Sequence, residues 1–345
     1  MSRTSVVIRH TALEQFCQNA FERVRVSSPN AYHAAQAIVA ANLRGVDSHG
    51  ITLLPMYIDR IRKGEISSDS EITIEKSEGA TMLLNGNNGL GHAVSLEAMR
   101  HAIDKAAIYG TSWVGVHESN HFGMAAHYAM KALSHDMIGI VMTVSNINTM
   151  APWNGLDVLL GNNPIAIAVP ALHEYPVVYD GAFSIAARRK IHDAYAAKER
   201  IPESWALTKD GCPTTDPKEA LDGILIPTGG YKGYGLALMI SLLAGGLTGA
   251  ALGTMVRNTN VGHLFGAINI GSFVAPRQMK EMVDATVREM RASRRIPGAD
   301  AIRVPGERGF ITEKQRKETG IPLSAKTHEG LRQLAQELQI EEILT

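Results

Sequence analysis

The hydrophobic pattern changes its period repeatedly along the chain, and this alternation constrains the fold more than any other feature of the sequence. Apolar residues recur at helical spacing in 28–45, 53–64, 92–110, 231–246, 276–294 and 327–338. The composition and alternation of strands are found in 71–77, 80–89, 111–116, 137–145, 164–170, 176–180 and 264–273. A chain with this pattern is expected to fold as an α/β protein in which helices cover a sheet.

Two stretches depart from this alternation. Residues 185–230 are polar and rich in turn formers, so we expect a surface excursion there with no core of its own. The apolar stretch 235–253 is broken by glycines and by Ser241, which predicts a buried helix and no membrane span.

Composition excludes several classes of function. The 345 residues include 34 Lys plus Arg and 34 Asp plus Glu with no long run of one sign, so neither nucleic acid nor an anionic membrane is an expected partner. The N-terminus lacks the apolar core of a signal peptide. Two distant cysteines, Cys17 and Cys212, fit a reducing compartment, and we therefore expect a cytoplasmic protein.

The stretch HESNHFGMAAH, residues 117–127, has the H-E-x-x-H spacing of a zinc hydrolase. Such a site would use His117, Glu118, His121 and His127, provided that the first two histidines share one helix. The preceding TSWVGV predicts a strand, however, and Ser119 and Asn120 favour a turn. We therefore expect His117 at a strand end and His121 near the following helix start, with no metal bound.

Glycine-rich stretches give incomplete phosphate-binding motifs. Gly89 and Gly91 lie between a predicted strand and helix, but Val94 occupies the third glycine position of a dinucleotide fingerprint. The stretch GGYKGYG is not a P-loop, because no Ser or Thr follows Lys232. A lysine at a helix start still makes a plausible anion site.

His49 lies in DSHG, between two predicted helices and among turn-forming residues. A histidine held on a rigid corner titrates near neutral pH and suits proton donation to a developing alkoxide. A purely structural role for His49 remains the alternative.

Six motifs together resemble those of one known family, in order and spacing. They are RGVDSHG, SNHFGMAAHYA, GNNPIAIAVP, IPESWALTKDGCPTTDP, YKGYGLALMISLL and GHLF. The sequence is similar to the malate/L-lactate dehydrogenase type 2 family, which includes ureidoglycolate dehydrogenase, L-sulfolactate dehydrogenase, diketogulonate reductase and piperideine-2-carboxylate reductase. The resemblance covers nearly the whole chain.

This resemblance implies hydride transfer between NAD or NADP and C2 of a small 2-oxo acid, 2-hydroxy acid or related cyclic imine. It also implies a fold other than the Rossmann fold, with a mixed sheet, and a homodimer whose site lies near the subunit interface. Residues 1–75 and 276–345 would form a helical domain, and 76–275 the domain that holds cofactor and catalytic residues.

Roles of individual residues follow from the same resemblance. His49 would donate the proton, Ser48 would hydrogen-bond the substrate, and His121 would be a second active-site histidine. The residues that would contact the cofactor are Ser145, Asn163, Pro164, Asp180, Gly181, Ala182, Lys232, Gly306 and Glu307.

Three positions depart from the family pattern. Leu53 stands where many members carry a carboxylate-binding arginine, DGAFS replaces the usual DMATS, and Arg189 precedes Lys190 where a glycine is usual. The main prediction is a 2-hydroxy acid dehydrogenase, with a cyclic-imine reductase of the same family as the alternative. A zinc hydrolase and an inactive relative that binds a nucleotide remain further hypotheses.

Overall fold

The computed structural model describes residues 5–256 and 259–340. Its helices are α1 (His10–Arg23), α2 (Ser28–Leu43), α3 (Leu54–Arg62), α4 (Gly91–Tyr109), α5 (Ala125–Ala129), α6 (Arg188–Ala197), α7 (Pro217–Asp222), α8 (Tyr231–Ile240), α9 (Pro276–Ala292), α10 (Glu307–Thr319) and α11 (Ala325–Leu338). Its strands are β1 (Ser5–Ile8), β2 (Thr73–Glu78), β3 (Thr81–Asn85), β4 (Thr111–Ser119), β5 (Met137–Thr143), β6 (Ile165–Val169), β7 (Val177–Gly181), β8 (Ala206–Leu207), β9 (Ile224–Leu225), β10 (Val261–Asn269) and β11 (Ile321–Ser324).

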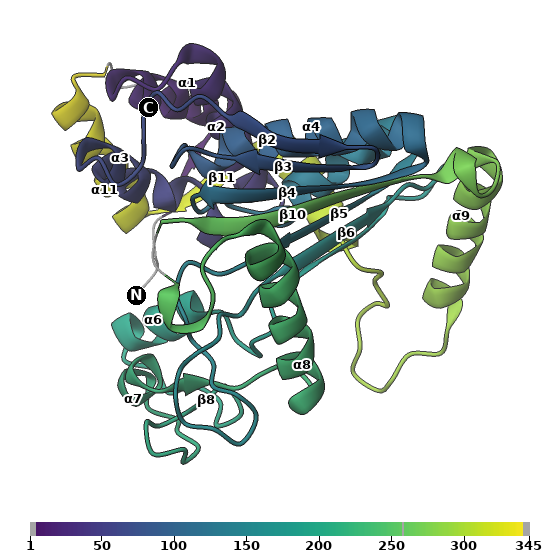
Figure 1. Ribbon diagram of the computed structural model, residues 1–345. Helices are drawn as coiled ribbons and strands as arrows, with labels where there is room; N and C mark the ends of the chain where they lie inside the picture. Colours follow the sequence, from purple (N-terminus) through teal and green to yellow (C-terminus); the bar gives the residue numbers. More distant parts are fainter. Residues whose placement is uncertain (1–4, 257–258, 341–345) are drawn as a thin grey trace.

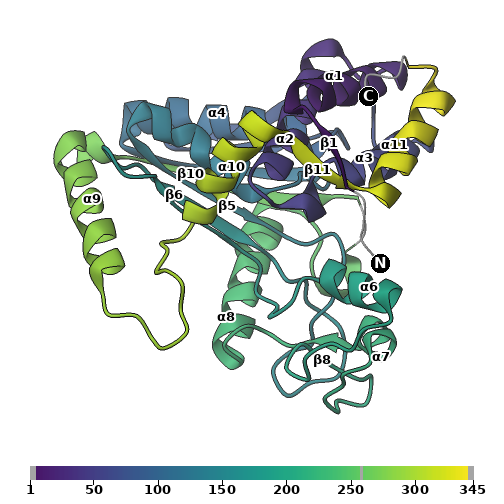
Figure 2. The ribbon, with the colours of Figure 1, turned by 180° about the vertical axis from the view of Figure 1, so that it is seen from behind.

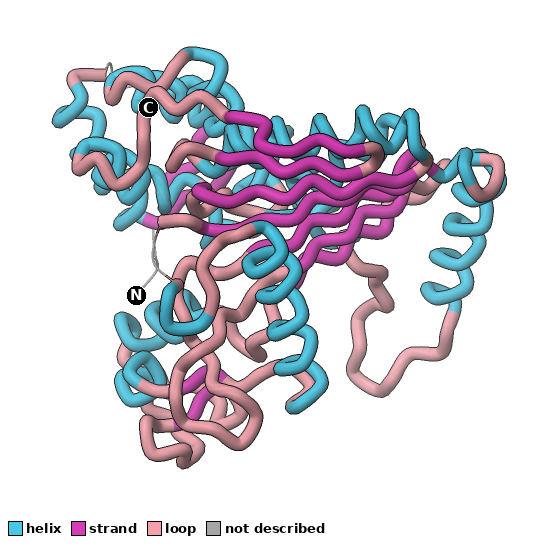
Figure 3. Tube along the Cα trace, viewed as in Figure 1, coloured by secondary structure: helices cyan, strands magenta, loops and turns pink. Residues whose placement is uncertain are grey.

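A seven-stranded sheet in the described part of the chain organises the molecule, in the order β2-β3-β4-β10-β5-β6-β7 (Figure 3). β3 and β4 pair in parallel through the crossover helix α4, and the other neighbours pair antiparallel. α4 and α5 cover one face of this sheet, whereas α8 lies on the other (Figures 1 and 2). The sheet is therefore mixed, unlike the parallel sheet of a Rossmann domain.

The two ends of the chain meet in one helical layer beside the sheet. β1 pairs with β11, and a shared apolar cluster joins α1, α2, α3 and α11 (Figure 2). The helix α9 lies elsewhere, beyond the opposite end of the sheet (Figure 1). The division into a helical domain of 1–75 with 276–345 and a sheet domain of 76–275 stays a prediction, and α9 does not share the apolar cluster of the former.

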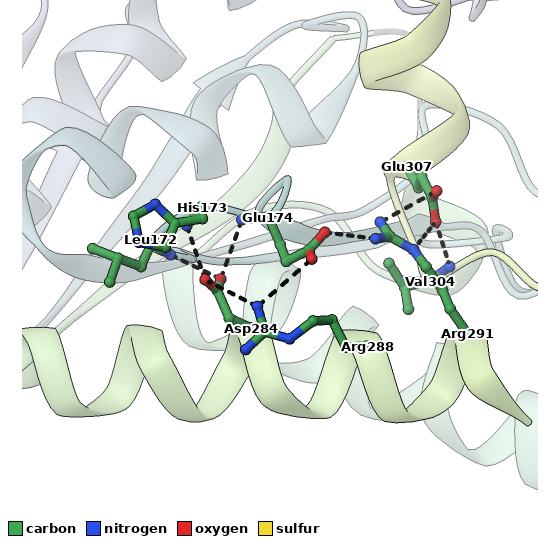
Figure 4. A network of polar contacts seen from close by, with 8 residues as sticks. All are labelled: Leu172, His173, Glu174, Asp284, Arg288, Arg291, Val304 and Glu307. Atoms are coloured by element: carbon green, nitrogen blue, oxygen red, sulfur yellow. Dashed lines mark hydrogen bonds and ion pairs between the residues drawn. The ribbon is translucent and has the colours of Figure 1, made fainter.

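A polar network fixes α9 to the sheet. The buried carboxylate of Asp284 accepts backbone N–H donors from Leu172, His173 and Glu174, which follow β6 (Figure 4). Further along α9, Arg291 donates to the carboxylates of Glu174 and Glu307. This network ties α9 to the start of α10.

Two stretches differ in part from the expectations. Residues 185–230 contain α6, α7 and the β8–β9 pair, and their buried residues Ile191, Ile201, Ala206, Ala220 and Leu225 join an apolar cluster that they share with α8 and the sheet. These apolar residues are separated by turns, so no periodic signal marks them. α8 is buried on one side only in the single chain, since Leu236 and Met239, and Leu242 in the helical turn that continues it, are 53%, 51% and 45% exposed. No helix within the described ranges is long and apolar enough to cross a membrane.

Candidate active site

A cavity of about 630 Å³ lies where the helical layer meets the sheet. Its walls come from the segments 44–56, 121–126, 143–149, 178–189 and 306–309. Ligand sites of proteins occupy about 300–1,000 Å³, so this cavity has the size of a substrate and cofactor site. Nine of the residues predicted from the resemblance line it: Ser48, His49, His121, Ser145, Pro164, Asp180, Gly181, Ala182 and Gly306.

His49 is held by the short 3₁₀ turn Asp47–His49 that follows α2. The Asp47 carboxylate accepts from Asn42 Nδ2 at 2.6 Å and from Arg316 at 2.7 Å, and Asn42 Oδ1 accepts the backbone N–H of Ile51 at 2.7 Å. These bonds fix both sides of the turn. The Ser48 hydroxyl lies 2.9 Å from His49 Nδ1, which leaves Nε2 as the nitrogen without a partner in the described part.

His121 lies in the loop between β4 and α5. The preceding Asn120 anchors this loop, because its amide donates to the Gly89 carbonyl at 2.9 Å and its oxygen accepts from Arg60 at 3.1 Å. The Tyr57 hydroxyl lies 2.6 Å from His121 Nδ1. The loop and the 3₁₀ turn place the rings of His49 and His121 with centroids 5.7 Å apart and nearly parallel.

Burial keeps both histidines neutral. Desolvation lowers the pKa of His49 below its ordinary value. The pKa of His121 is lowered further, first by desolvation; repulsion from His49, His92 and His263, whenever these are protonated, and from Arg60 acts in the same direction. At neutral pH each ring therefore carries one proton.

The other histidines of H-E-x-x-H point elsewhere. His117 lies on β4 and its Nε2 meets the Glu75 carboxylate of β2 at 3.0 Å. Glu118 has a φ of 49° and its backbone bonds to Asn88 and Asn260, while His127 is buried in α5. Within 5–256 and 259–340, no group of three or more His, Cys, Asp or Glu side chains could hold a metal ion. The zinc-hydrolase hypothesis thus loses its geometric basis, because strand and loop separate the required histidines.

Another part of the cavity lining consists of charged residues. Asp180 lies one residue before the end of β7 and accepts the Ala126 N–H at 2.8 Å. Burial raises its pKa to about 6, although that bond and Arg44 act in the opposite direction. The Arg44 guanidinium lies 4.1 Å from the Phe310 ring centroid and pairs with Glu313 at 3.2 Å. Arg188, Arg189 and Arg308 also line this cavity.

Glycines shape the wall beside these charges. Gly306 has a φ of +86°, and a Cβ there would lie 2.8 Å from the carbonyl oxygen of Val178. A Cβ on Gly309 would lie 2.8 Å from Arg44 Nη2. Only glycine keeps this wall flat and the Arg44 side chain in place.

A family model described as malate/L-lactate dehydrogenase matches residues 8–332. The chain belongs to this family. The malate/(S)-sulfolactate dehydrogenase of Methanothermus fervidus is 41% identical over 323 residues, which cover 92% of this chain and 93% of that protein. The solved structure of malate dehydrogenase from Entamoeba histolytica matches with a TM-score of 0.94 at 30% identity, over 98% of this chain and 99% of that chain.

Two further members of the malate/L-lactate dehydrogenase family are named for their cofactor. Ureidoglycolate dehydrogenase (NAD+) of Escherichia coli K12 is 30% identical over 92% of both chains. (2R)-3-Sulfolactate dehydrogenase (NADP+) of Chromohalobacter salexigens is 33% identical over 87% of this chain and 90% of that protein. The predicted family and the α/β fold with a mixed, non-Rossmann sheet are confirmed.

Three residues that the family pattern assigns to the cofactor do not line the cavity. Asn163 is fully buried, where its side chain accepts the Ser145 N–H and donates to the Ala237 carbonyl and the Ser241 hydroxyl. Glu307 faces Arg291 and the Val304 N–H (Figure 4). Lys232 is exposed at the start of α8. Asn163 and Glu307 thus support the wall from behind.

Three residues at or next to the cavity were not predicted from the sequence. Arg44 and Met56 line it, and Tyr57 contacts His121 from behind. Arg44 lies within the RGVDSHG motif, which is a signal that could have found it. From the sequence, Tyr57 is only one of the apolar residues of the helix predicted over 53–64, because its partner His121 lies 64 positions away.

Proposed function

We propose that this protein is an oxidoreductase that uses NAD or NADP to interconvert a small 2-oxo acid and the corresponding 2-hydroxy acid. One observation carries the proposal: two nearly parallel histidines share a cavity with a glycine-walled, charged surface, in a chain of the malate/L-lactate dehydrogenase family. The names of its relatives support the reaction and both cofactors.

The charged end of the cavity fits a nicotinamide dinucleotide. Gly181, Ala182, Gly306 and Gly309 give a surface that a flat or extended ligand can approach, and Asp180 Oδ1 has no hydrogen-bond partner within the described chain. Arg308 lines the same surface and has no acceptor there either, so it suits a phosphate. When bound, the nicotinamide supplies or accepts the hydride at C2 of the substrate.

The histidine end supplies the proton. Reduction of a carbonyl consumes one proton with each hydride, and His49 lines the cavity with Nε2 unpartnered in the described chain while Ser48 holds Nδ1. Ser48 and His121 would orient the substrate oxygen. His49 would therefore protonate the oxygen in reduction and accept the proton in oxidation.

Leu53 and Met56 make the wall beside the histidines apolar. Leu53 replaces the carboxylate-binding arginine of the family pattern, so other groups must hold the substrate carboxylate in this chain. This departure is the reason to test monocarboxylic, dicarboxylic and sulfonated 2-oxo acids and cyclic imines in parallel.

The test is turnover. Purified protein should bind NADH or NADPH and oxidise it with at least one member of that panel. Binding without turnover of any member would favour an inactive relative, and no cofactor binding would refute the proposal. Tightly held stoichiometric zinc with peptide hydrolysis would revive the hydrolase.

We also propose a homodimer that covers the exposed face of α8. Four large apolar side chains of one helical segment, Leu236, Leu238, Met239 and Leu242, are exposed in the single chain, which is costly in water. Lys232 begins the same helix and would lie at this interface, close to a site of either subunit. A Met239→Glu variant should have the mass of a monomer in light scattering. A Lys232→Glu variant tests the lysine: unchanged cofactor affinity would show that Lys232 does not contact the cofactor.

A cytoplasmic location is the last part of the proposal. Both cysteines are free, Cys17 buried and Cys212 exposed, which suits a reducing compartment. Cell fractionation of the native host with an antibody to the protein tests it.

A further inference from the structure

Tyr57 lies directly behind His121, and its hydroxyl has a single partner among the described residues. The tyrosine belongs to α3, is fully buried, and brings its hydroxyl oxygen within 2.6 Å of His121 Nδ1. The ring of His92 packs edge-on against the Tyr57 ring, with centroids 4.8 Å apart. Both ring nitrogens of His92 are buried without a hydrogen bond in the described part, so His92 offers the tyrosine no second acceptor.

We propose that Tyr57 holds His121 in the tautomer with its proton on Nε2, so that His121 donates a hydrogen bond to the substrate oxygen while His49 carries the proton that is transferred. This inference rests on the proposed function and divides its chemistry between the two histidines.

The tautomer follows from counting donors and acceptors. Burial raises the pKa of the Tyr57 hydroxyl well above its ordinary value, so Tyr57 keeps its proton. If His121 carried its proton on Nδ1, that N–H would donate to the tyrosine oxygen and leave the tyrosine proton buried without an acceptor. With the proton on Nε2, Tyr57 donates to Nδ1 and both groups are satisfied.

Desolvation is the main cause that keeps His121 neutral. The groups near it that can carry positive charge are Arg60 on α3, His49 on the 3₁₀ turn, His92 on α4 and His263 on β10, and each disfavours a second proton on His121 when it is itself charged. Burial lowers the pKa of His92 and of His263 to about 3, so these two are neutral at neutral pH. Arg60 is permanently charged and sits behind the same loop, bonded to Asn120. A neutral His121 that gave up its only ring proton would become an imidazolate, which this buried site does not stabilise.

His49 is suited to the transfer itself. Desolvation is the cause that lowers its pKa, and it lines the cavity with no partner for Nε2 among the described residues, so this nitrogen is free to take up a proton. In reduction a C–H bond of the reduced nicotinamide would break, leaving the oxidised ring, as its hydride forms the new bond to C2 and the carbon–oxygen π pair moves to oxygen. The N–H bond of protonated His49 breaks, and its proton joins that oxygen. The proton of His121 stays on Nε2 throughout.

Glutamine variants separate the two roles. A glutamine side-chain amide can donate a hydrogen bond, but it does not act as an acid or a base near neutral pH. His121→Gln should keep kcat within about ten-fold of the unmodified enzyme, whereas His49→Gln should lose about 100- to 10,000-fold, the usual contribution of an acid–base group. The reverse order would overturn the assignment.

A spectroscopic measurement tests the tautomer without turnover. Long-range ¹H–¹⁵N correlation of ¹⁵N-histidine-labelled full-length enzyme, with His121 assigned by its loss in His121→Gln, should give Nε2–H and an acceptor Nδ1 from about pH 5 to 9. Tyr57→Phe keeps the ring and should give a mixture of tautomers. A protonated or Nδ1–H His121 at pH 7 in the unmodified enzyme would refute the proposal.

Kinetics of Tyr57→Phe distinguish positioning from packing. The variant should lower kcat about ten-fold, leave the cofactor KM unchanged, and add a second ionisation to the pH profile of kcat. Equal losses in kcat and cofactor affinity would indicate a structural role only. Absence of turnover with every substrate would refute the proposed function. The NMR experiment would still test the tautomer of His121, because it does not depend on activity.

Discussion

The cavity lining has two chemically different parts, one made of neutral histidines and one made of charged residues and glycines. On one side Ser48, His49 and His121, half-buried in the cavity wall, and the buried Tyr57 form a cluster without a carboxylate, in which side chains are held by short hydrogen bonds. Elsewhere in the lining Arg44 lies against Gly306 and Gly309, and Asp180 and three further arginines, Arg188, Arg189 and Arg308, line the same cavity. Neutral imidazoles suit proton handling, and fixed charges with exposed backbone suit recognition of an anionic cofactor. Changes in the first part should therefore act on kcat, and changes in the second on cofactor affinity.

The largest effect is expected for His49→Ala. Loss of the group that exchanges the proton should lower kcat about 100- to 10,000-fold while the cofactor Kd stays within two- to three-fold. Steady-state kinetics and fluorescence titration with NADH and NADPH measure the two quantities. His117→Ala is the matched control, because His117 belongs to the same sequence stretch but faces Glu75 outside the cavity. A comparable loss of activity in the control would contradict the division between the two histidines of that stretch.

Asp180→Asn should change stability with pH at the charged end. Asp180 has its pKa raised from 3.8 to about 6, so the folded state keeps a proton that the unfolded state has already lost. This contribution stabilises the fold fully below about pH 4 and disappears as pH rises through 6. The asparagine variant, which can still accept the Ala126 N–H, should thus match the wild type at pH 4 and be more stable by about 3 kcal/mol above pH 6.

Urea unfolding of both proteins between pH 4 and 8 measures this difference. Cofactor titration of the same variant should give weaker binding above pH 6, where the wild type carries a charge. A pH-independent difference in stability would mean that Asp180 is ionised like an exposed carboxyl.

Gly306→Ala should weaken cofactor binding about ten-fold and destabilise the fold by about 1–3 kcal/mol. The added Cβ would lie within 2.8 Å of the Val178 backbone and displace the wall. Gly298→Ala is the matched control, since Gly298 has a similar φ of +83° and no atom within 4 Å of the added carbon. It shares the backbone strain alone and should leave the cofactor Kd unchanged. Equal effects of the two variants on Kd would show that strain, and not the wall, is responsible.

The sequence predicted the sheet and most of its helices because their apolar residues are periodic, and it predicted nine lining residues because short motifs keep them together. It failed where contacts join distant segments. α1 and α10 were not predicted, the helices and the strand pair within 185–230 were not predicted, and α8, predicted as a buried helix, exposes one face in the single chain. Asn163 and Glu307 lie in the right motifs but support the wall from behind, and only their partners reveal this.

The smallest effect, and the most informative about the substrate, is expected for Leu53→Arg. Leu53 lines the neutral end and packs partly against the apolar cluster of the helical layer, so the stem of an arginine can follow the same path. A guanidinium there would introduce the charge that this end lacks. If the substrate carboxylate lies beside Leu53, the KM for 2-oxo acids should fall about three- to ten-fold, the range of one charge-assisted hydrogen bond partly offset by desolvation. The cofactor Kd should not change, and Leu53→Met, which adds no charge, should behave as the wild type. An unchanged KM would place the carboxylate at the charged end, near Arg308, and the two ends would then both take part in substrate recognition.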